Sequence, residues 1–227
     1  MAWTLVRGTD SSGASPVGCA VVLLAWLIRH GESESNAGTP SAQPGASPLT
    51  ARGWEQAEGL AATLPEVPAL IVTSPYRRAA QTAEPTVARF PDVRREEWPV
   101  QEFTYLGDFH ARTSTSEERR PYVLDYWHRA DPHLSLGGAE TFAGLVARAN
   151  ACLTRLAAQP DGPVAVFTHG LFMRAVAWVV LTGGTADHDG MRAFHRFMTG
   201  IAVPNCAVMG LRFPTGAPPT LVAGAAW

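Results

Sequence analysis

The segment "VVLLAWLIRHG", residues 21–31, is an unbroken apolar run that ends in an arginine, a histidine and a glycine. Two further runs have the same form: "ALIVT", residues 69–73, leads into "SPYRR", and "VAVFT", residues 164–168, leads into "HG". Apolar runs without alternation are typical of parallel strands that are covered on both faces. We therefore expect parallel strands over 21–28, 69–73 and 164–168, each ending in polar residues.

Helical patterns lie between and after these strands. Thr50 can cap a helix that runs to about residue 64, and Ser74 with Pro75 predicts the start of a second helix, which Pro85 should bend or end. Further helices are expected over 139–158, 171–181 and 186–197, and two strands over 206–213 and 220–224. This alternation predicts an α/β fold: a three-layer sandwich with a mostly parallel central sheet and helices on both faces.

Three segments depart from the alternation. Residues 1–18, rich in Gly, Ser and Thr, read as a loose N-terminal extension to a single domain over 19–227. The segment from about 103 to 138 carries charges and aromatic residues, and we interpret it as a small helical cap insertion over the site. Residues 36–48 predict a flexible loop near the first polar cluster. The apolar run that ends at residue 28 is too short to span a bilayer.

Composition excludes several classes of function. The formal net charge of −2 gives no general attraction to nucleic acid or to an anionic membrane. All 18 basic residues are arginine, which excludes a Walker-type phosphate loop and a lysine Schiff base. The three cysteines are scattered, and no HxxxH or HExxH spacing occurs among the histidines, so no metal site is expected. Unpaired cysteines favour a cytoplasmic protein.

The polar residues at the strand ends suit a phosphoryl group. Ligands of open α/β sheets bind beyond the carboxyl ends of the strands, where Arg29, His30, Arg78 and His169 should meet. Arginine binds phosphate with two parallel hydrogen bonds. Neighbouring arginines favour the neutral form of a histidine, and a neutral imidazole is a competent nucleophile.

Backbone features at the same strand ends support anion binding. Ser74-Pro75 and His169-Gly170 are each expected to open a helix, whose N-terminus supplies amide donors and a favourable dipole. Gly31 and Gly170 should let the backbone approach a ligand closely.

Three motifs in order, "LIRHGES", "SPYRRAAQTAE" and "FTHG", resemble the histidine phosphatase superfamily, the phosphoglycerate mutase-like proteins, over residues 21–210. The resemblance implies that His30 is the nucleophile and is phosphorylated on Nε2. It also implies that three side chains bind the transferring phosphoryl group: Arg29, Arg78 and His169. Arg78 rather than Arg77 fits the arginine of the second motif.

The resemblance implies further site residues. Asn36 matches a position that contacts phosphate, and Ser33, Gly31 and Gly170 within the motifs are assigned to substrate binding. No cofactor is implied.

The proton donor is expected after the third strand of the family's fold. The segment "VQEFTYLG" resembles that region and points to Glu102. The Trp-Glu-Gly that often follows is replaced by "DFHA", so Asp108 stays as an alternative.

Two positions separate a phosphatase from a mutase. Mutases of the family commonly have Trp before the Asn that follows the first motif, and a small polar residue after the second His-Gly. This chain has Ser35 and Leu171 there. The resemblance therefore favours hydrolysis of a phosphate monoester on a small substrate; phosphoglycerate mutase-type transfer and a non-catalytic phosphoanion-binding module are the alternatives.

Overall fold

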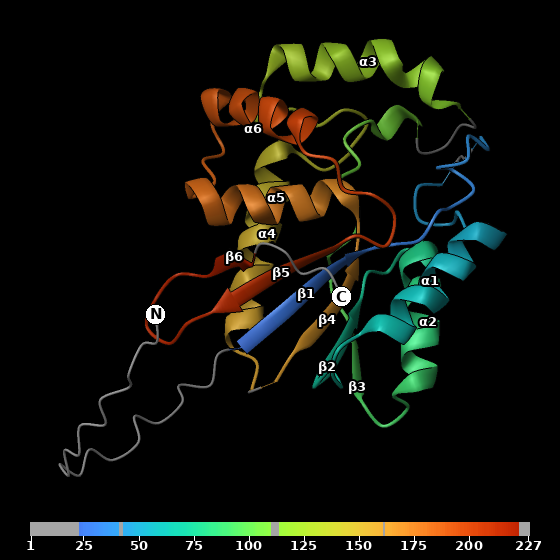
Figure 1. Cartoon of the computed structure of the whole chain (residues 1–227). Coiled ribbons are helices and arrows are strands. Elements are labelled where there is room, and N and C mark those ends of the chain that lie inside the picture. The colour runs from blue at the N-terminus through green and yellow to red at the C-terminus, as the bar shows by residue number, and fades with distance from the viewer. Residues whose placement is uncertain (1–22, 41–42, 110–113, 161, 223–227) are drawn as a thin grey trace, which may run out of the picture.

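The computed structural model describes residues 23–40, 43–109, 114–160 and 162–222 and contains a six-stranded sheet (Figure 1). The strand order is β3-β2-β4-β1-β5-β6. The strands are β1 (Leu23–Arg29), β2 (Leu70–Thr73), β3 (Arg94–Glu97), β4 (Val164–Thr168), β5 (Val208–Phe213) and β6 (Thr220–Val222). The strands β1 to β4 are parallel to one another, and β5 pairs antiparallel with both β1 and β6. The predicted mostly parallel sheet is confirmed.

Helices cover both faces of this sheet, as predicted. They are α1 (Ala51–Thr63), α2 (Arg77–Arg89), α3 (Ser116–Arg129), α4 (Phe142–Ala157), α5 (Gly170–Thr182) and α6 (His188–Gly200), with a 3₁₀ turn η1 (Gly107–Phe109). Figure 1 shows α1 and α2 on one side and α4 and α5 on the other, with α6 and α3 farther out beyond α5. The result is a three-layer α/β sandwich.

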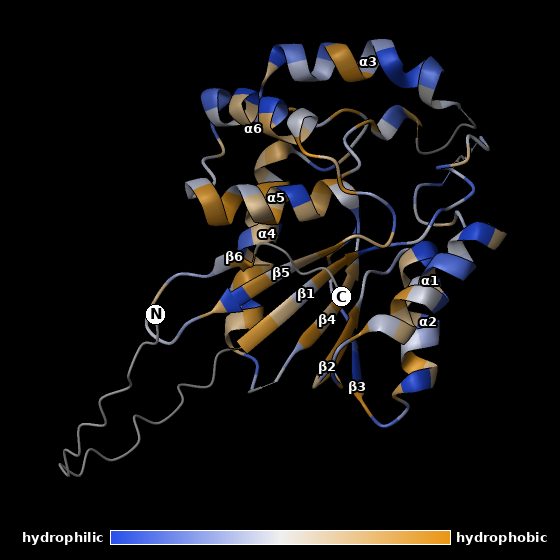
Figure 2. Ribbon diagram, in the orientation of Figure 1, coloured by the Kyte–Doolittle hydropathy of each residue, from blue (hydrophilic) through white to orange (hydrophobic). Residues whose placement is uncertain are grey.

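Alternation along the central strands divides the core in two. In β1, Leu23, Ala25 and Leu27 belong to a cluster with α4 and α5. Trp26 and Ile28 point to the opposite face and pack with residues of α1 and α2. Because successive side chains of a strand point to opposite faces, a continuous apolar run serves both layers at once. Figure 2 shows these central strands as the hydrophobic interior.

The strand β3 was not predicted, because its sequence "RREE" is entirely charged. It pairs with β2 alone and forms one edge of the sheet, with three of its four residues exposed. An edge strand needs little apolar burial, and charged side chains on it discourage pairing with another chain. Hydrophobic pattern alone therefore could not find it.

The predicted start of α2 was wrong, and Pro85 does not end the helix. The helix begins at Arg77 rather than after Ser74, because the Ser74 hydroxyl accepts from the Tyr76 amide and contacts His169 instead of capping a helix. The helix also continues through Pro85 to its end, since buried residues on both sides, Ala83 and Thr86, hold it against the core.

Polar side chains cap the starts of α1, α4 and α6. Thr50 accepts from the Gly53 amide and caps α1 as predicted. Thr141 caps α4, so that helix begins three residues later than expected, and Asp187 caps α6. A side-chain oxygen at the N-cap satisfies an amide that would otherwise lack a partner.

The cap segment contains η1 and α3, which lies above α6 in Figure 1. Tyr126 and Trp127 of α3 are buried and join the main core, whereas Tyr122 is 51% exposed. The helix is thus attached through buried aromatic residues, and Figure 2 shows both hydrophilic and hydrophobic turns along it.

The predicted N-terminal extension, residues 1–18, lies outside the described residues, as does part of the 36–48 loop. Among the helices that the structure describes, none is long and apolar enough to cross a membrane.

Candidate active site

The carboxyl ends of β1, β2 and β4 meet at one edge of the sheet. Because β4 lies between β2 and β1 in parallel register, the residues that follow the three strands emerge side by side. The ring centroids of His30 and His169 are 5.0 Å apart. Ser74, at the end of β2, reaches the His169 ring. The fold thus brings the three sequence motifs to one place.

His30 is held as a neutral imidazole with a defined tautomer. Its Nδ1 lies 2.7 Å from the carbonyl oxygen of Gly31, which can only accept, so Nδ1 carries the proton. Its Nε2 accepts from the Nε of Arg78 at 3.0 Å. Nε2 therefore carries the lone pair and is the nucleophilic atom of the ring.

The electrostatic environment keeps His30 unprotonated. Burial, followed by the positive charge of Arg78, lowers the pKa of His30 from 6.5 to about 3. Only 2% of the residue is exposed. Burial and the neighbouring guanidinium both disfavour the protonated, positively charged form of the ring. The lone pair on Nε2 is therefore present at neutral pH.

Arg78 contacts three other residues at this edge of the sheet. Besides His30, it donates to the Pro44 carbonyl at 2.6 Å and lies over the Tyr76 ring, 5.1 Å from its centroid. The side chain is buried, whereas that of Arg77 is exposed. Of the two arginines, Arg78 is therefore the one that contacts His30.

His169 lies behind His30 and is completely buried. Its Nε2 is 2.8 Å from the hydroxyl oxygen of Ser74, and its ring meets Tyr76 edge-on. Burial and then Arg78 lower the pKa of His169 well below its usual range. Its Nδ1 has no hydrogen-bond partner among the described residues.

Arg29 ends β1 next to His30. Its Nη1 donates to the Val203 carbonyl at 2.5 Å, and its buried Nε has no acceptor among the residues that the structure describes. A Cβ on Gly170 would lie 3.5 Å from that Nε, so the first residue of α5 runs alongside the guanidinium. An unsatisfied cationic donor beside a helix N-terminus favours an anionic ligand.

Glu102 sits at the same helix N-terminus. Its Oε1 accepts from the amides of Leu171 at 3.0 Å, Phe172 at 3.3 Å and Phe103 at 3.1 Å. Burial lowers the pKa of Arg29 and of Arg78, and the charge of Glu102 is the largest influence that opposes this lowering. The carboxylate is therefore within electrostatic reach of both arginines.

Asp108, the alternative proton donor, is placed differently. It lies exposed in η1, with its Oδ1 against the backbone of Gly137. It does not line the cavity that Glu102 shares with Arg78. Geometry favours Glu102 for any proton transfer in this site.

The loop residues expected to bind substrate have structural contacts of their own. Ser33 is buried, with its hydroxyl 3.1 Å from that of Ser35, and Asn36 is exposed and accepts from the Asn205 amide at 3.1 Å. The Gly31 amide donates to Thr82 Oγ1. A Cβ on Gly31 would lie 2.5 Å from the Gly53 carbonyl oxygen, so close packing against α1 demands glycine there.

Two polar residues near the site were not found from the sequence. Asn205 donates to the His30 carbonyl at 3.0 Å, from a loop far along the chain. Arg148 of α4 donates to the Pro99 and Gln101 carbonyls and forms a two-point ion pair with Glu140. It thereby holds the backbone that leads into Glu102. Neither residue lies in a strand-end motif, so no local signal marked them.

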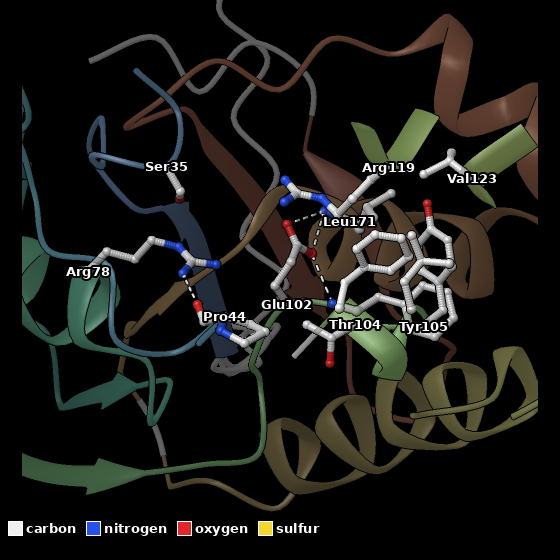
Figure 3. A pocket seen from close by; sticks show the side chains of 12 residues that line it. Ser35, Pro44, Arg78, Glu102, Thr104, Tyr105, Arg119, Val123 and Leu171 are labelled. Atoms are coloured by element: carbon white, nitrogen blue, oxygen red, sulfur yellow. Dashed lines mark hydrogen bonds between the residues drawn. The ribbon is translucent and has the colours of Figure 1, made fainter. Parts of the chain in front are cut away.

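A cavity of about 290 Å³ opens beside Arg78 and Glu102. Figure 3 shows these two side chains on one part of its wall and the Tyr105 ring on another, with Arg119 and Val123 contributed by α3. Ser35 and Leu171, the two positions that separate the expected phosphatase from a mutase, also line it.

Comparison with known proteins finds relatives that match most of the chain. The histidine phosphatase superfamily (branch 1) matches residues 25–219 of the chain. Adenosylcobalamin/alpha-ribazole phosphatase of Salmonella typhimurium is 31% identical over 142 residues, 60% of this chain and 68% of that protein. Glucosyl-3-phosphoglycerate phosphatase of Mycobacterium tuberculosis is 29% identical over 166 residues, 68% of this chain and 74% of that protein.

Solved structures share the fold. The structure described as mycobacterial hydrolase 1 superposes with a TM-score of 0.70 at 23% identity, covering 90% of this chain and 99% of its own. Mycobacterial glucosyl-3-phosphoglycerate phosphatase superposes with a TM-score of 0.66 at 22% identity, covering 88% and 97%.

Proposed function

Because the chain belongs to the histidine phosphatase superfamily (branch 1), we propose that it is a metal-independent phosphatase that hydrolyses a phosphate monoester through a phosphohistidine on His30. The observation that carries the proposal is the lone pair on Nε2 of a buried, neutral His30, held beside the Arg78 guanidinium. The relatives with curated names are themselves phosphatases, which supports hydrolysis over mutase transfer.

In the first step, the bound phosphoryl group takes the place of His30 Nε2 as the partner of Arg78. The Nε2 lone pair attacks phosphorus, a P–N bond forms, and the bond from phosphorus to the ester oxygen breaks. Glu102 donates a proton to the departing oxygen, which leaves as the alcohol. The Gly31 carbonyl stabilises the positive charge that develops on the ring through its bond to Nδ1.

In the second step, water attacks phosphorus from the side that the alcohol has left. Glu102 takes a proton from this water, the P–N bond breaks, and inorganic phosphate and neutral His30 are produced. The proton that Glu102 gave in the first step is thus recovered in the second.

The remaining residues stabilise the transferring group. The unsatisfied Nε of Arg29 and the guanidinium of Arg78 can donate hydrogen bonds to the phosphoryl oxygens. The dipole at the N-terminus of α5 stabilises their negative charge. We assign His169 to the same task, with Ser74 holding its ring in place. We also propose that four further residues contribute to substrate binding: Gly31, Ser33, Asn36 and Gly170.

The proposed substrate is a small phosphorylated molecule rather than a nucleic acid, in keeping with a net charge of −2. We also propose a cytoplasmic location, supported by the free thiols of Cys152 and Cys206.

The proposal is tested by phosphate release from a panel of phosphorylated metabolites, with and without chelator. His30→Ala should lower kcat/KM by about 10³-fold or more, because no second group can replace the nucleophile. A rapid quench with ³²P-labelled substrate should show an acid-labile, base-stable label on His30.

His133→Ala is the matched control, since His133 is exposed and outside the site. It should keep wild-type turnover. Normal turnover by His30→Ala, or label on another residue, would overturn the proposal. Transfer of phosphate to a second hydroxyl without release into water would replace hydrolysis with mutase chemistry.

A further inference from the structure

The cavity beside Arg78 and Glu102 has a wall whose chemistry differs from that of the phosphoryl site. Six apolar side chains form this wall, which we call the aromatic pocket: Phe103, Tyr105, Leu106, Phe109, Val123 and Leu171. Arg78 and Glu102 stand at its inner end (Figure 3). The pocket is thus continuous with the place where the phosphoryl group is expected to bind.

The central ring of this pocket is held rigidly. Tyr105 stacks on Tyr126 with centroids 4.4 Å apart, and its hydroxyl accepts from Trp127 Nε1 at 3.2 Å. Phe103 packs against the same ring at 4.9 Å. The bond from Trp127 fixes the position of the Tyr105 hydroxyl, and the face of the Tyr105 ring contributes apolar surface to the pocket. Rings fixed in this way form a preorganised surface for a flat ligand.

The proposed chemistry decides which part of the substrate lies there. In an in-line displacement, the departing oxygen is opposite the attacking Nε2 of His30. The proton donor must reach that oxygen, and Glu102 directly precedes Phe103 at the inner end of the pocket. The alcohol portion of the substrate therefore extends from Glu102 into the aromatic pocket.

The composition of the wall restricts that alcohol. Ser35, Thr104 and Arg119 also line the cavity and can bind some hydroxyl groups. A polyol would still bury its other hydroxyl groups against the six apolar side chains, where they lose water without gaining equal partners. An apolar ring would instead replace water at these surfaces with favourable contacts. The cavity volume of about 290 Å³ is large enough to hold a leaving group that contains a ring.

Building on the phosphatase function proposed above, we propose that the substrate is a phosphate monoester of a small alcohol that carries an apolar ring, and that the aromatic pocket binds this leaving group.

The test compares three esters of primary alcohols, so that the departing oxygen is chemically similar: benzyl phosphate, ethyl phosphate and glucose 6-phosphate. Benzyl phosphate should have a kcat/KM at least about tenfold above each of the others, because even one buried methylene is worth about tenfold. Equal or faster turnover of ethyl phosphate or glucose 6-phosphate would overturn the proposal.

Variants of α3 provide a matched pair. Val123→Phe places a ring inside the pocket and should lower the benzyl-to-ethyl ratio of kcat/KM by about tenfold or more. Leu124→Phe makes the same kind of change on the outer face of the helix, where Leu124 is 58% exposed, and should leave the ratio at the wild-type value. A ratio that does not respond to Val123→Phe contradicts the pocket assignment.

Binding separates this proposal from the phosphatase proposal. Benzylphosphonate and ethylphosphonate, which cannot be hydrolysed, are titrated by calorimetry. Tighter binding of benzylphosphonate by about tenfold without hydrolysis of any ester would support the pocket and overturn the phosphatase proposal. Equal binding of the two phosphonates would overturn the pocket whether or not esters are hydrolysed.

Discussion

Acid should destabilise this protein through His30, because the folded chain holds that ring neutral. Burial and Arg78 lower the pKa of His30 from 6.5 to about 3. Between these two values the unfolded chain binds a proton that the folded chain does not. The stabilising contribution is therefore complete above pH 6.5 and is lost as the pH falls from 6.5 toward 3.

The size of the loss follows from the distance below the unfolded pKa. At about pH 5.0 the unfolded imidazole is about 1.5 pH units below its pKa, and each unit corresponds to about 1.36 kcal/mol. The folded ring is still unprotonated at that pH, so His30 alone should reduce the free energy of unfolding by about 2 kcal/mol relative to about pH 7.5. His169, whose pKa is lowered for the same reason, adds a loss of the same sign.

Urea unfolding of the wild type and of His30→Gln, in phosphate-free buffer at about pH 7.5 and about pH 5.0, isolates this contribution. The difference in unfolding free energy between the two proteins should shift by about 2 kcal/mol in favour of the variant at the lower pH. His133→Gln, a change at an exposed histidine, should show no such shift. If His30→Gln loses as much stability as the wild type over this range, the reasoning is refuted.

Three further substitutions test the scaffold. Gly31→Ala places a Cβ 2.5 Å from the Gly53 carbonyl oxygen and should lower the free energy of unfolding by about 1–3 kcal/mol. Thermal unfolding measures this loss, and an unchanged Tm would contradict the packing argument. Arg148→Met should lower the free energy of unfolding by about 3 kcal/mol, because Glu140 loses its ion-pair partner. It should also lower kcat by a larger factor than it raises KM, because the backbone before Glu102 loses the hydrogen bond from Arg148. Loss of stability alone, with kcat intact, would argue against that positioning role. Thr50→Ala removes the α1 cap and should cost about 1 kcal/mol by urea unfolding, with little effect on turnover; no loss would mean that the cap is dispensable.

Much of the architecture could be predicted from three apolar runs. Strands such as β1 and β4 contact helices on both faces. Their consecutive residues are therefore all apolar, and this pattern is visible in the sequence. The charged β3 could not be predicted in this way, because an edge strand is stabilised by its hydrogen bonds to β2 rather than by its own hydrophobicity.

The local rules failed where tertiary contacts compete with them. Ser74 has the residue type of a helix cap, but the His169 ring and the Tyr76 amide engage its hydroxyl. Pro85 should interrupt α2, but packing of the flanking turns keeps the helix intact. Propensity describes an isolated segment, and such contacts outweigh it.

By itself, the sequence determined the α/β class and placed Arg29, His30, Arg78 and His169 at strand ends, because each strand and the polar residues after it are adjacent in the chain. Only the tertiary structure decided what depends on distant segments. It set the proton on His30 Nδ1 and the lone pair on Nε2 through Gly31 and Arg78, and it fixed Glu102 at the start of α5. Protonation and proton transfer depend on burial and on partners within about 3 Å, and a linear pattern does not contain those partners.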